Sequence, residues 1–173
     1  EKFICFHDFT LNRIFKKKKS IKDMKYSQIQ NISAQNKKPI PLLKDLLNAS
    51  KNKYLLFIEI KPTFSKKILK KLLHETSKFS KCIFISFRHK NIYNLLKIRS
   101  STKVGLSYSR SASVKTIIKK SNNNKINFLV LDKFFLQNKK VNATKIRKYY
   151  YTIKTKSEFK KYSKNNNLIF ENL

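Results

Sequence analysis

The sequence predicts an α/β fold with a buried parallel sheet, of the TIM (β/α)8 barrel type but incomplete. Short, continuous apolar runs recur along the chain, amphipathic helical segments separate them, and no long linker interrupts the alternation. Such a rhythm is typical of βαβ units whose sheet is covered on both faces. A complete barrel takes about 250 residues. We therefore expect the 173 residues to form a single domain, residues 1–173, that lacks the first two strands of a barrel.

The first fifty residues are the least regular part of the chain. Phe3–Phe6 is a short β-like run that predicts a seventh strand of uncertain placement. A polar stretch follows over residues 16–38, and its middle, Ser20–Ile32, predicts a short helix. Two prolines then break the chain, after which leucines at i, i+1, i+4 and i+5 predict a helix over Leu42–Ala49.

From Tyr54 onward, six predicted strands alternate with helices. Apolar runs predict the strands Tyr54–Lys61, Cys82–Phe87, Lys103–Tyr108, Ile126–Leu131, Tyr149–Ile153 and Asn167–Phe170. Amphipathic periodicity predicts the helices Phe64–Phe79, Asn91–Ile98, Ser111–Lys120, Val141–Ile146 and Thr155–Tyr162. Catalytic residues of such barrels gather at the carboxyl ends of the strands, so polar residues at these ends are the candidates for a site.

The net charge of +32 suggests a polyanionic partner, but the composition favours a solvated basic surface. Lysine supplies 36 of the 41 basic residues and arginine five, spread along the chain apart from a run at Lys16–Lys19. A protein that reads a DNA sequence would be expected to use more arginine, whose planar fork fits bases and phosphates. We predict no specific nucleic-acid partner, and an anion-attracting role is the alternative.

The sequence gives little information on the compartment and the redox chemistry of the protein. No apolar run approaches the ~18 residues of a membrane span, so we expect no transmembrane segment. The chain starts at Glu1 rather than Met, and we expect a natural amino terminus to be missing. The expected location is cytoplasmic, with export left open, and nothing indicates the oligomeric state. Cys5 and Cys82 lie in apolar runs and are expected to be core thiols.

Two polar clusters supply the groups that phosphate-ester chemistry needs. His7, Asp8 and Arg13 lie within seven residues of one another, and Glu59 and Lys61 stand two positions apart at the end of an apolar strand. Side chains at i and i+2 of a strand share one face. A general acid/base, a hard-metal ligand and a phosphate-binding cation together predict hydrolysis of a phosphate ester.

The residues of both clusters resemble motifs of the glycerophosphodiester phosphodiesterase family. His7-Asp8-x-Thr10-Leu11-x-Arg13 resembles the family's HDxTLxR motif, and Phe57–Lys61 resembles its xIEIK strand. Four weaker similarities follow in the family's order: Ile40–Leu43 with IPTLxE, Ile85–Phe87 with SSF, Tyr151–Thr155 with WTVNT, where Tyr replaces Trp, and 167–173 with GIITDRP. The resemblance therefore covers essentially the whole chain.

The resemblance implies a TIM-barrel enzyme of lipid or glycerol metabolism that uses Mg²⁺ or Ca²⁺. Its small-molecule substrate would be a glycerophosphodiester, cleaved to an alcohol and glycerol 3-phosphate. His7 would be the second of two acid/base histidines, Glu59 a metal ligand and Lys61 a contact to the phosphate. The family's first histidine stands in an HRG motif and its other metal ligands in an ExD motif, and this sequence contains neither. We therefore expect a chain truncated at its amino terminus and inactive by itself.

The residues of the two clusters also have plainer explanations. Glu59 and Lys61 would form an ordinary ion pair at a strand end, and His7 would make a structural hydrogen bond. Asp8 is expected to orient His7 or to cap the following turn rather than to take part in the chemistry. Arg13 is expected to anchor the loop rather than to bind substrate.

Four more residues near strand ends are weaker candidates. Phe87 and Tyr151 would line the mouth of a pocket or pack in the core. His89 lies just past a strand end, on the expected active face, and Asp132 is expected to cap a loop rather than to support a site. The alternative for the whole chain is a non-catalytic anion- or nucleic-acid-binding module on the same barrel.

Overall fold

The computed structural model describes residues 2–171, and their contacts divide them into two compact units. The first unit contains the residues up to Tyr54 together with 75–80, and the second contains residues 55–74 and those from Lys81 onward. Glu1 and the last two residues of the segment that resembles GIITDRP lie outside the described residues. One domain over residues 1–173 stays a prediction.

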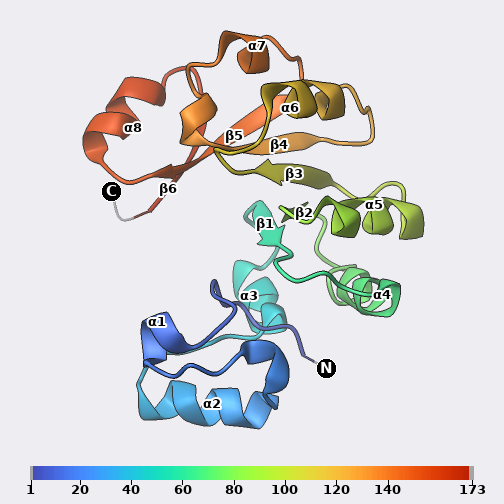
Figure 1. Cartoon of the computed structure of the whole chain (residues 1–173). Coiled ribbons are helices and arrows are strands. Elements are labelled where there is room, and N and C mark those ends of the chain that lie inside the picture. The colour runs from blue at the N-terminus through green and yellow to red at the C-terminus, as the bar shows by residue number, and fades with distance from the viewer. Residues whose placement is uncertain (1, 172–173) are drawn as a thin grey trace. The chain divides into compact units, whose positions relative to one another are not determined.

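The second unit is built on a parallel sheet of six strands whose spatial order follows the chain (Figure 1). The strands are β1 Leu56–Glu59, β2 Cys82–Ser86, β3 Val104–Tyr108, β4 Phe128–Asp132, β5 Arg147–Ile153 and β6 Asn167–Phe170. All neighbouring strands are parallel, with one register shift between Tyr150 and Ile153 where β5 meets β6. The six predicted strands are confirmed, and together they form a half-barrel.

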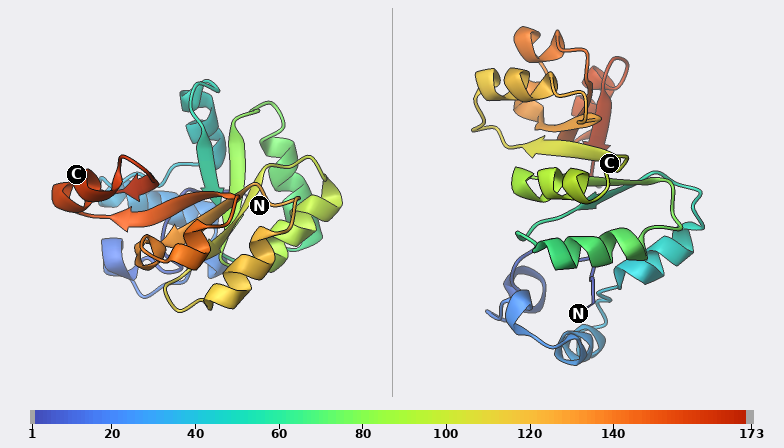
Figure 2. Two further views of the ribbon diagram at one scale, coloured as in Figure 1. Left: turned by 90° about the horizontal axis from the view of Figure 1, so that it is seen from above. Right: turned by 90° about the vertical axis from the view of Figure 1, so that its right-hand side faces the viewer.

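Helices connect the strands and cover one face of this sheet (Figure 2). They are α4 Lys66–Glu75, α5 His89–Ile98, α6 Val114–Ser121, α7 Lys139–Asn142 and α8 Lys156–Tyr162, with a 3-10 turn, η2, at Lys133–Phe135. The side chains of Ser113, Asn138 and Thr155 each accept a backbone N–H at a helix start, which satisfies a donor that the helix leaves open. The Asn138 cap explains why α7 begins two residues before the predicted Val141.

The opposite face of the sheet, called here the inner face, carries an apolar cluster. Ile83, Ile85 and Val130 form its buried part, and Phe57, Phe128, Tyr149, Tyr151 and Ile169 pack against it. Successive side chains of a strand point to opposite faces. Glu59, two residues after Phe57, therefore belongs to the inner face, as does Asp132, two residues after Val130.

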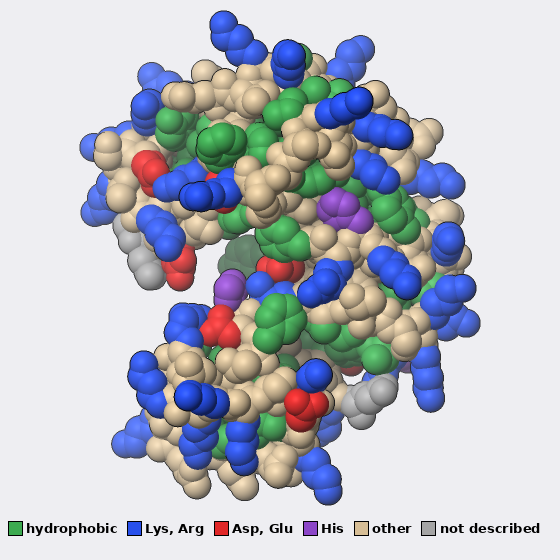
Figure 3. All heavy atoms as spheres, viewed as in Figure 1, with side chains coloured by type: hydrophobic (Ala, Val, Ile, Leu, Met, Phe, Trp, Pro, Cys, Tyr) green, Lys and Arg blue, Asp and Glu red, His purple; other side chains and the backbone are tan. Residues whose placement is uncertain are grey.

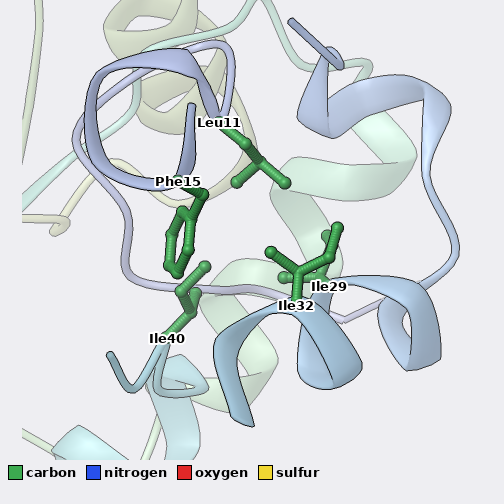
Figure 4. Packing of buried hydrophobic residues seen from close by; sticks show 5 residues of the cluster. All are labelled: Leu11, Phe15, Ile29, Ile32 and Ile40. Atoms are coloured by element: carbon green, nitrogen blue, oxygen red, sulfur yellow. The ribbon is translucent and has the colours of Figure 1, made fainter. Parts of the chain in front are cut away.

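The first unit consists of short helices around a small core (Figure 4). Its elements are α1 Asn12–Phe15, the 3-10 turn η1 Ile21–Asp23, α2 Tyr26–Gln35 and α3 Leu43–Ser50. The core side chains Leu11, Phe15, Ile29, Ile32 and Ile40 point toward one another from α1, α2 and the segment before α3. The helix predicted over Leu42–Ala49 is confirmed as α3.

Two predictions for this unit were wrong. Phe3–Phe6 does not form a strand of the sheet, because Ile4 makes an isolated antiparallel bridge to Leu42 instead. The helix predicted over Ser20–Ile32 is divided, because extended backbone at Met24 and Lys25 separates η1 from α2. The four-residue helix α1 was not predicted, since a single turn carries too little periodicity.

Two findings bear on compartment and redox chemistry. Among residues 2–171, no helix is both long enough and apolar enough to cross a membrane. Cys82 is buried and Cys5 is half-buried, and both are free thiols. Burial raises the pKa of both thiols, so neither is activated as a nucleophile.

Candidate active site

The end of β1 presents an ion pair on the inner face of the second unit. Glu59 is the last residue of β1, and Lys61 follows it on the same face, as the strand period requires. Lys61 Nζ lies 3.1 Å from Glu59 Oε1, and the two side chains are 22% and 27% exposed. A partly shielded pair interacts more strongly than one in bulk water, yet both groups remain within reach of a ligand.

Two aromatic rings from distant strands meet on the same face. The ring of Phe87, just after β2, stands perpendicular to that of Tyr151 in β5, with centroids 5.9 Å apart. The Tyr151 hydroxyl donates a hydrogen bond to the Tyr108 carbonyl over 2.9 Å. Burial, with a contribution from the Asp132 and Glu59 carboxylates, raises the pKa of Tyr151, so its phenol stays neutral. Phe87 is 45% exposed, so it is not packed in the core.

His89 and Asp132 make structural bonds at this end of the sheet. His89 Nε2 donates to the Ser107 carbonyl over 3.0 Å, and its ring packs against Tyr108 with centroids 4.8 Å apart. Burial lowers the pKa of His89, which favours the neutral ring. Asp132 Oδ1 accepts the Phe134 N–H over 2.9 Å and so caps η2, as expected.

The first unit holds the other predicted group, His7, Asp8 and Arg13, in one hydrogen-bonded cluster. His7 Nδ1 lies 2.7 Å from Asp8 Oδ1. Arg13 donates two hydrogen bonds to the same carboxylate, from Nε to Oδ2 over 2.6 Å and from Nη2 to Oδ1 over 3.2 Å. The Asp8 side chain is 19% exposed, whereas His7 and Arg13 are 72% and 64% exposed. Asp8 therefore orients His7 rather than capping α1, whose start has no side-chain cap.

The backbone around this cluster is tied into a closed loop. Leu11 N–H donates to the Lys19 carbonyl over 3.0 Å, and Ile21 N–H donates to the Phe9 carbonyl over the same distance. Lys16 ends α1 with a left-handed backbone conformation, φ 57°. The basic run Lys16–Lys19 therefore lies in the second half of this loop, and the segment that follows His7 forms its first half.

The bond to Asp8 fixes the tautomer of His7. The hydrogen bond from Arg13, then that from His7, lowers the pKa of Asp8 to about 2, so Asp8 is an ionised acceptor above that pH. A carboxylate without a proton cannot donate, so Nδ1 of His7 must carry the hydrogen. The lone pair of the neutral imidazole is then on Nε2, where it can accept a proton.

The described residues do not complete a divalent-metal site by themselves. Within residues 2–171, no three His, Cys, Asp or Glu side chains gather closely enough to hold a metal ion. Glu59 offers one carboxylate, and one of its oxygens already contacts Lys61. Mg²⁺ and Ca²⁺ take about six or more oxygen ligands.

Sequence reasoning missed two buried polar residues next to Lys61, namely Ser86 and Asn91, which are both fully buried. Asn91 shares the buried stripe of α5 with Ile92 and Leu95. A polar side chain is placed on such a stripe when its hydrogen bonds are satisfied there. An amide on the apolar face of a predicted helix was therefore the sequence signal that could have identified Asn91.

One comparison with known proteins identifies a family. The sequence model of the glycerophosphoryl diester phosphodiesterase family matches residues 1–167. No curated protein sequence matches this chain significantly.

Solved structures of such enzymes share the fold. A putative glycerophosphodiester phosphodiesterase from Galdieria sulphuraria aligns with a TM-score of 0.81 at 14% identity, over 98% of this chain and 76% of that one. A phosphodiesterase from Oleispira antarctica, solved in complex with the product sn-glycerol-3-phosphate, aligns with a TM-score of 0.74 at 14% identity, over 96% and 74%. A glycerophosphodiester phosphodiesterase from Agrobacterium tumefaciens gives 0.71 at 13% identity, over 96% and 76%.

Proposed function

Because the chain belongs to the glycerophosphoryl diester phosphodiesterase family, we propose that it hydrolyses glycerophosphodiesters to an alcohol and glycerol 3-phosphate. Family and fold make it a phosphodiesterase-like hydrolase. The observation that carries the proposal is the partly exposed pair of Glu59 and Lys61 at the carboxyl end of β1. The glycerol 3-phosphate in the Oleispira antarctica structure supports a substrate of this class.

His7 is the proposed acid/base. Its Nδ1–H is held by Asp8, so Nε2 would accept a proton from the attacking water or return one to the leaving alcohol. Arg13 fixes Asp8 through two hydrogen bonds and would thereby act on His7 indirectly.

Lys61 is the proposed contact to the phosphate, because an ammonium group donates strong hydrogen bonds to phosphate oxygens. Phe87 and Tyr151 would form an apolar wall for the carbon skeleton of the substrate. The perpendicular packing of the two rings supports this, since it places two aromatic side chains side by side on the inner face.

The cofactor and the metabolic setting are part of the same proposal. Glu59 would be one ligand of Mg²⁺ or Ca²⁺, which prefer oxygen donors. Among residues 2–171 no cluster of three His, Cys, Asp or Glu side chains adds to Glu59, and water and substrate phosphate oxygens would fill other positions around the ion. Glycerophosphodiesters arise from phospholipids, which would place the reaction in lipid or glycerol metabolism, with a cytoplasmic location.

The alternative of an anion- or nucleic-acid-binding module draws on the net charge of +32. Figure 3 shows Lys and Arg side chains scattered over the visible face rather than gathered in one patch. A scattered distribution is typical of a solvated basic surface, so we do not adopt this alternative.

The test is a phosphodiesterase assay of the natural reading frame on glycerophosphocholine with added Mg²⁺ or Ca²⁺. We expect His7→Ala and Glu59→Ala each to lower kcat/KM by about 100-fold or more, the usual range for losing an acid/base group or a metal ligand. His74→Ala is the matched control, because this exposed histidine lies on α4, and it should keep full activity. A folded protein without metal-dependent activity on a panel of glycerophosphodiesters would refute the proposal.

A further inference from the structure

We propose that Ser86 and Asn91 are positioning residues that fix the backbone around Lys61 and so set the affinity of the site for phosphate. The inference rests on the proposed role of Lys61 as the phosphate contact. Neither side chain is proposed to touch the substrate.

The backbone on the amino side of Lys61 is held although β1 has ended. Ile60 N–H donates to the Ile85 carbonyl over 2.8 Å, which continues the ladder between β1 and β2. The Ile60 carbonyl accepts the Ser86 hydroxyl over 2.6 Å. Ile60 stands between Glu59 and Lys61, so the Ser86 bond fixes the peptide unit that joins Ile60 to Lys61.

The backbone on the carboxyl side of Lys61 is held by Asn91. Its Nδ2 donates to the Pro62 carbonyl over 2.8 Å, and its Oδ1 accepts the Phe64 N–H over 3.0 Å. Pro62 has no N–H, so it cannot donate a bond that would continue the ladder to β2. The amide side chain of Asn91 therefore takes the place of a neighbouring strand for residues 62–64.

Ser86 and Asn91 are also bound to each other, so the two halves act as one network. Asn91 Nδ2 lies 3.4 Å from Ser86 Oγ, and the Arg88 N–H donates to the same oxygen over 3.0 Å. All polar atoms of both side chains are thus used, and both residues are fully buried. Removing Ser86 would take a hydrogen bond from the carbonyl of buried Ile60, and removing Asn91 would release the carbonyl of Pro62 and loosen the segment around Lys61.

This network has a consequence for binding because lysine is flexible. A lysine side chain has many rotamers and loses conformational entropy when it is fixed. The fixed main chain on both sides sets the position and direction of the Lys61 side chain, and the ion pair to Glu59 at 3.1 Å restrains its ammonium group, so part of the ordering cost is met before a ligand binds. A loosened segment would let the ammonium group move away from the site.

The experiment measures the dissociation constant of sn-glycerol 3-phosphate by calorimetry, and kcat and KM, on the natural chain. Asn91→Ala and Ser86→Ala are made alone and in a Lys61→Ala background. We expect each single change to weaken binding by about tenfold, equal to about 1.4 kcal/mol. In the Lys61→Ala background the same changes should have little further effect, because the interaction they support is gone.

Asn127→Ala is the matched control. Asn127 Oδ1 accepts the Val104 N–H over 2.9 Å, an amide-to-backbone bond of the same kind at the amino end of β3. Its loss should lower the thermal midpoint without changing the dissociation constant. Ser86→Ala removes one oxygen atom only, so it keeps the test decisive if Asn91→Ala does not fold.

Two results overturn the inference in distinguishable ways. If Lys61→Ala weakens binding but Asn91→Ala and Ser86→Ala do not, or act equally in both backgrounds, the positioning role is wrong and the proposed function stands. If Lys61→Ala leaves the dissociation constant unchanged, the phosphate role of Lys61 is wrong and the positioning role fails with it.

Discussion

Asp8 shows how two neighbours can hold a carboxyl group in its ionised form near the surface. Arg13 supplies two hydrogen bonds and His7 a third, and together they lower the pKa of Asp8 from 3.8 to about 2. The folded state therefore binds this proton less readily than the unfolded chain does. The resulting stabilisation is complete above the unfolded pKa and is lost as the pH falls through the folded one.

We predict that the carboxyl carbon of Asp8 titrates with a midpoint of about 2 when it is followed by NMR. Arg13→Ala removes the largest cause and should raise that midpoint toward 3.8, the usual pKa of an aspartate. The wild-type protein should then lose more stability than the variant between about pH 4 and pH 3, because only the wild type has this contribution to lose. A midpoint that Arg13→Ala does not move would contradict the assignment.

Two buried tyrosines are predicted to respond in opposite directions to loss of the hydroxyl group. Tyr108 Oη has no hydrogen-bond partner among the described residues, whereas Tyr150 Oη donates to Asn142 Oδ1 over 2.5 Å. We expect Tyr108→Phe to raise the free energy of unfolding by about 1 kcal/mol and Tyr150→Phe to lower it by about 1 kcal/mol. Chemical denaturation of both variants checks this, and a loss of stability in Tyr108→Phe would contradict it.

At the scale of elements, the sequence predicted the second unit well and the first unit poorly. In the second unit, apolar runs such as Cys82–Phe87 coincide with buried strands, because both faces of a central parallel strand are covered and no alternation is needed. In the first unit the backbone at Met24 and Lys25 is extended, and no proline or glycine marks that break. Local propensity therefore could not show it.

The candidate site was predictable to the extent that its parts are close in sequence. Glu59 and Lys61 follow from the strand period, and His7 with Asp8 and Arg13 from one short segment. The bonds of Asn91 go to Pro62 and Phe64, in a loop that the sequence separates from it by a helix and a strand. Only the assembled sheet brings them together.

We predict that a side chain at Gly105 of β3 would destabilise the fold through steric crowding rather than through backbone conformation. A Cβ atom there would lie 3.1 Å from Ile85 Cγ2, 3.2 Å from the Phe128 carbonyl oxygen and 3.3 Å from Phe128 Cβ. Because backbone cannot yield easily, we expect Gly105→Ala to lower the free energy of unfolding by about 1–3 kcal/mol.

Ser107→Ala is the control for Gly105→Ala, since Ser107 lies two residues further on the same face of β3. Its buried Oγ has no hydrogen-bond partner among residues 2–171, so its loss should leave stability unchanged or slightly higher. Thermal unfolding of the two variants measures the difference in stability between them. A Gly105→Ala protein as stable as Ser107→Ala would refute the steric explanation.

At the scale of the whole molecule, charge sets the response to salt. The chain has 41 basic and 9 acidic residues, and the described residues show four close ion pairs, one of which involves His7. Most of the positive charge is therefore uncompensated, and its mutual repulsion opposes the compact state.

We predict that the thermal midpoint rises by several degrees between about 20 mM and about 500 mM NaCl, because the screening length falls from roughly 20 Å to roughly 4 Å. KCl should raise the thermal midpoint by the same amount, because it has the same ionic strength. A midpoint that falls with salt would mean that the few ion pairs outweigh the repulsion.

The order of the strands has a consequence for biosynthesis. Each strand of the second unit pairs with its neighbours in the chain, from β1 through to β6, and no strand is inserted between two earlier ones. During translation, every newly released strand therefore meets an edge that has already formed, and the loop to be closed spans a single connecting segment. Synthesis and assembly of this sheet run in the same direction, and β6 docks last.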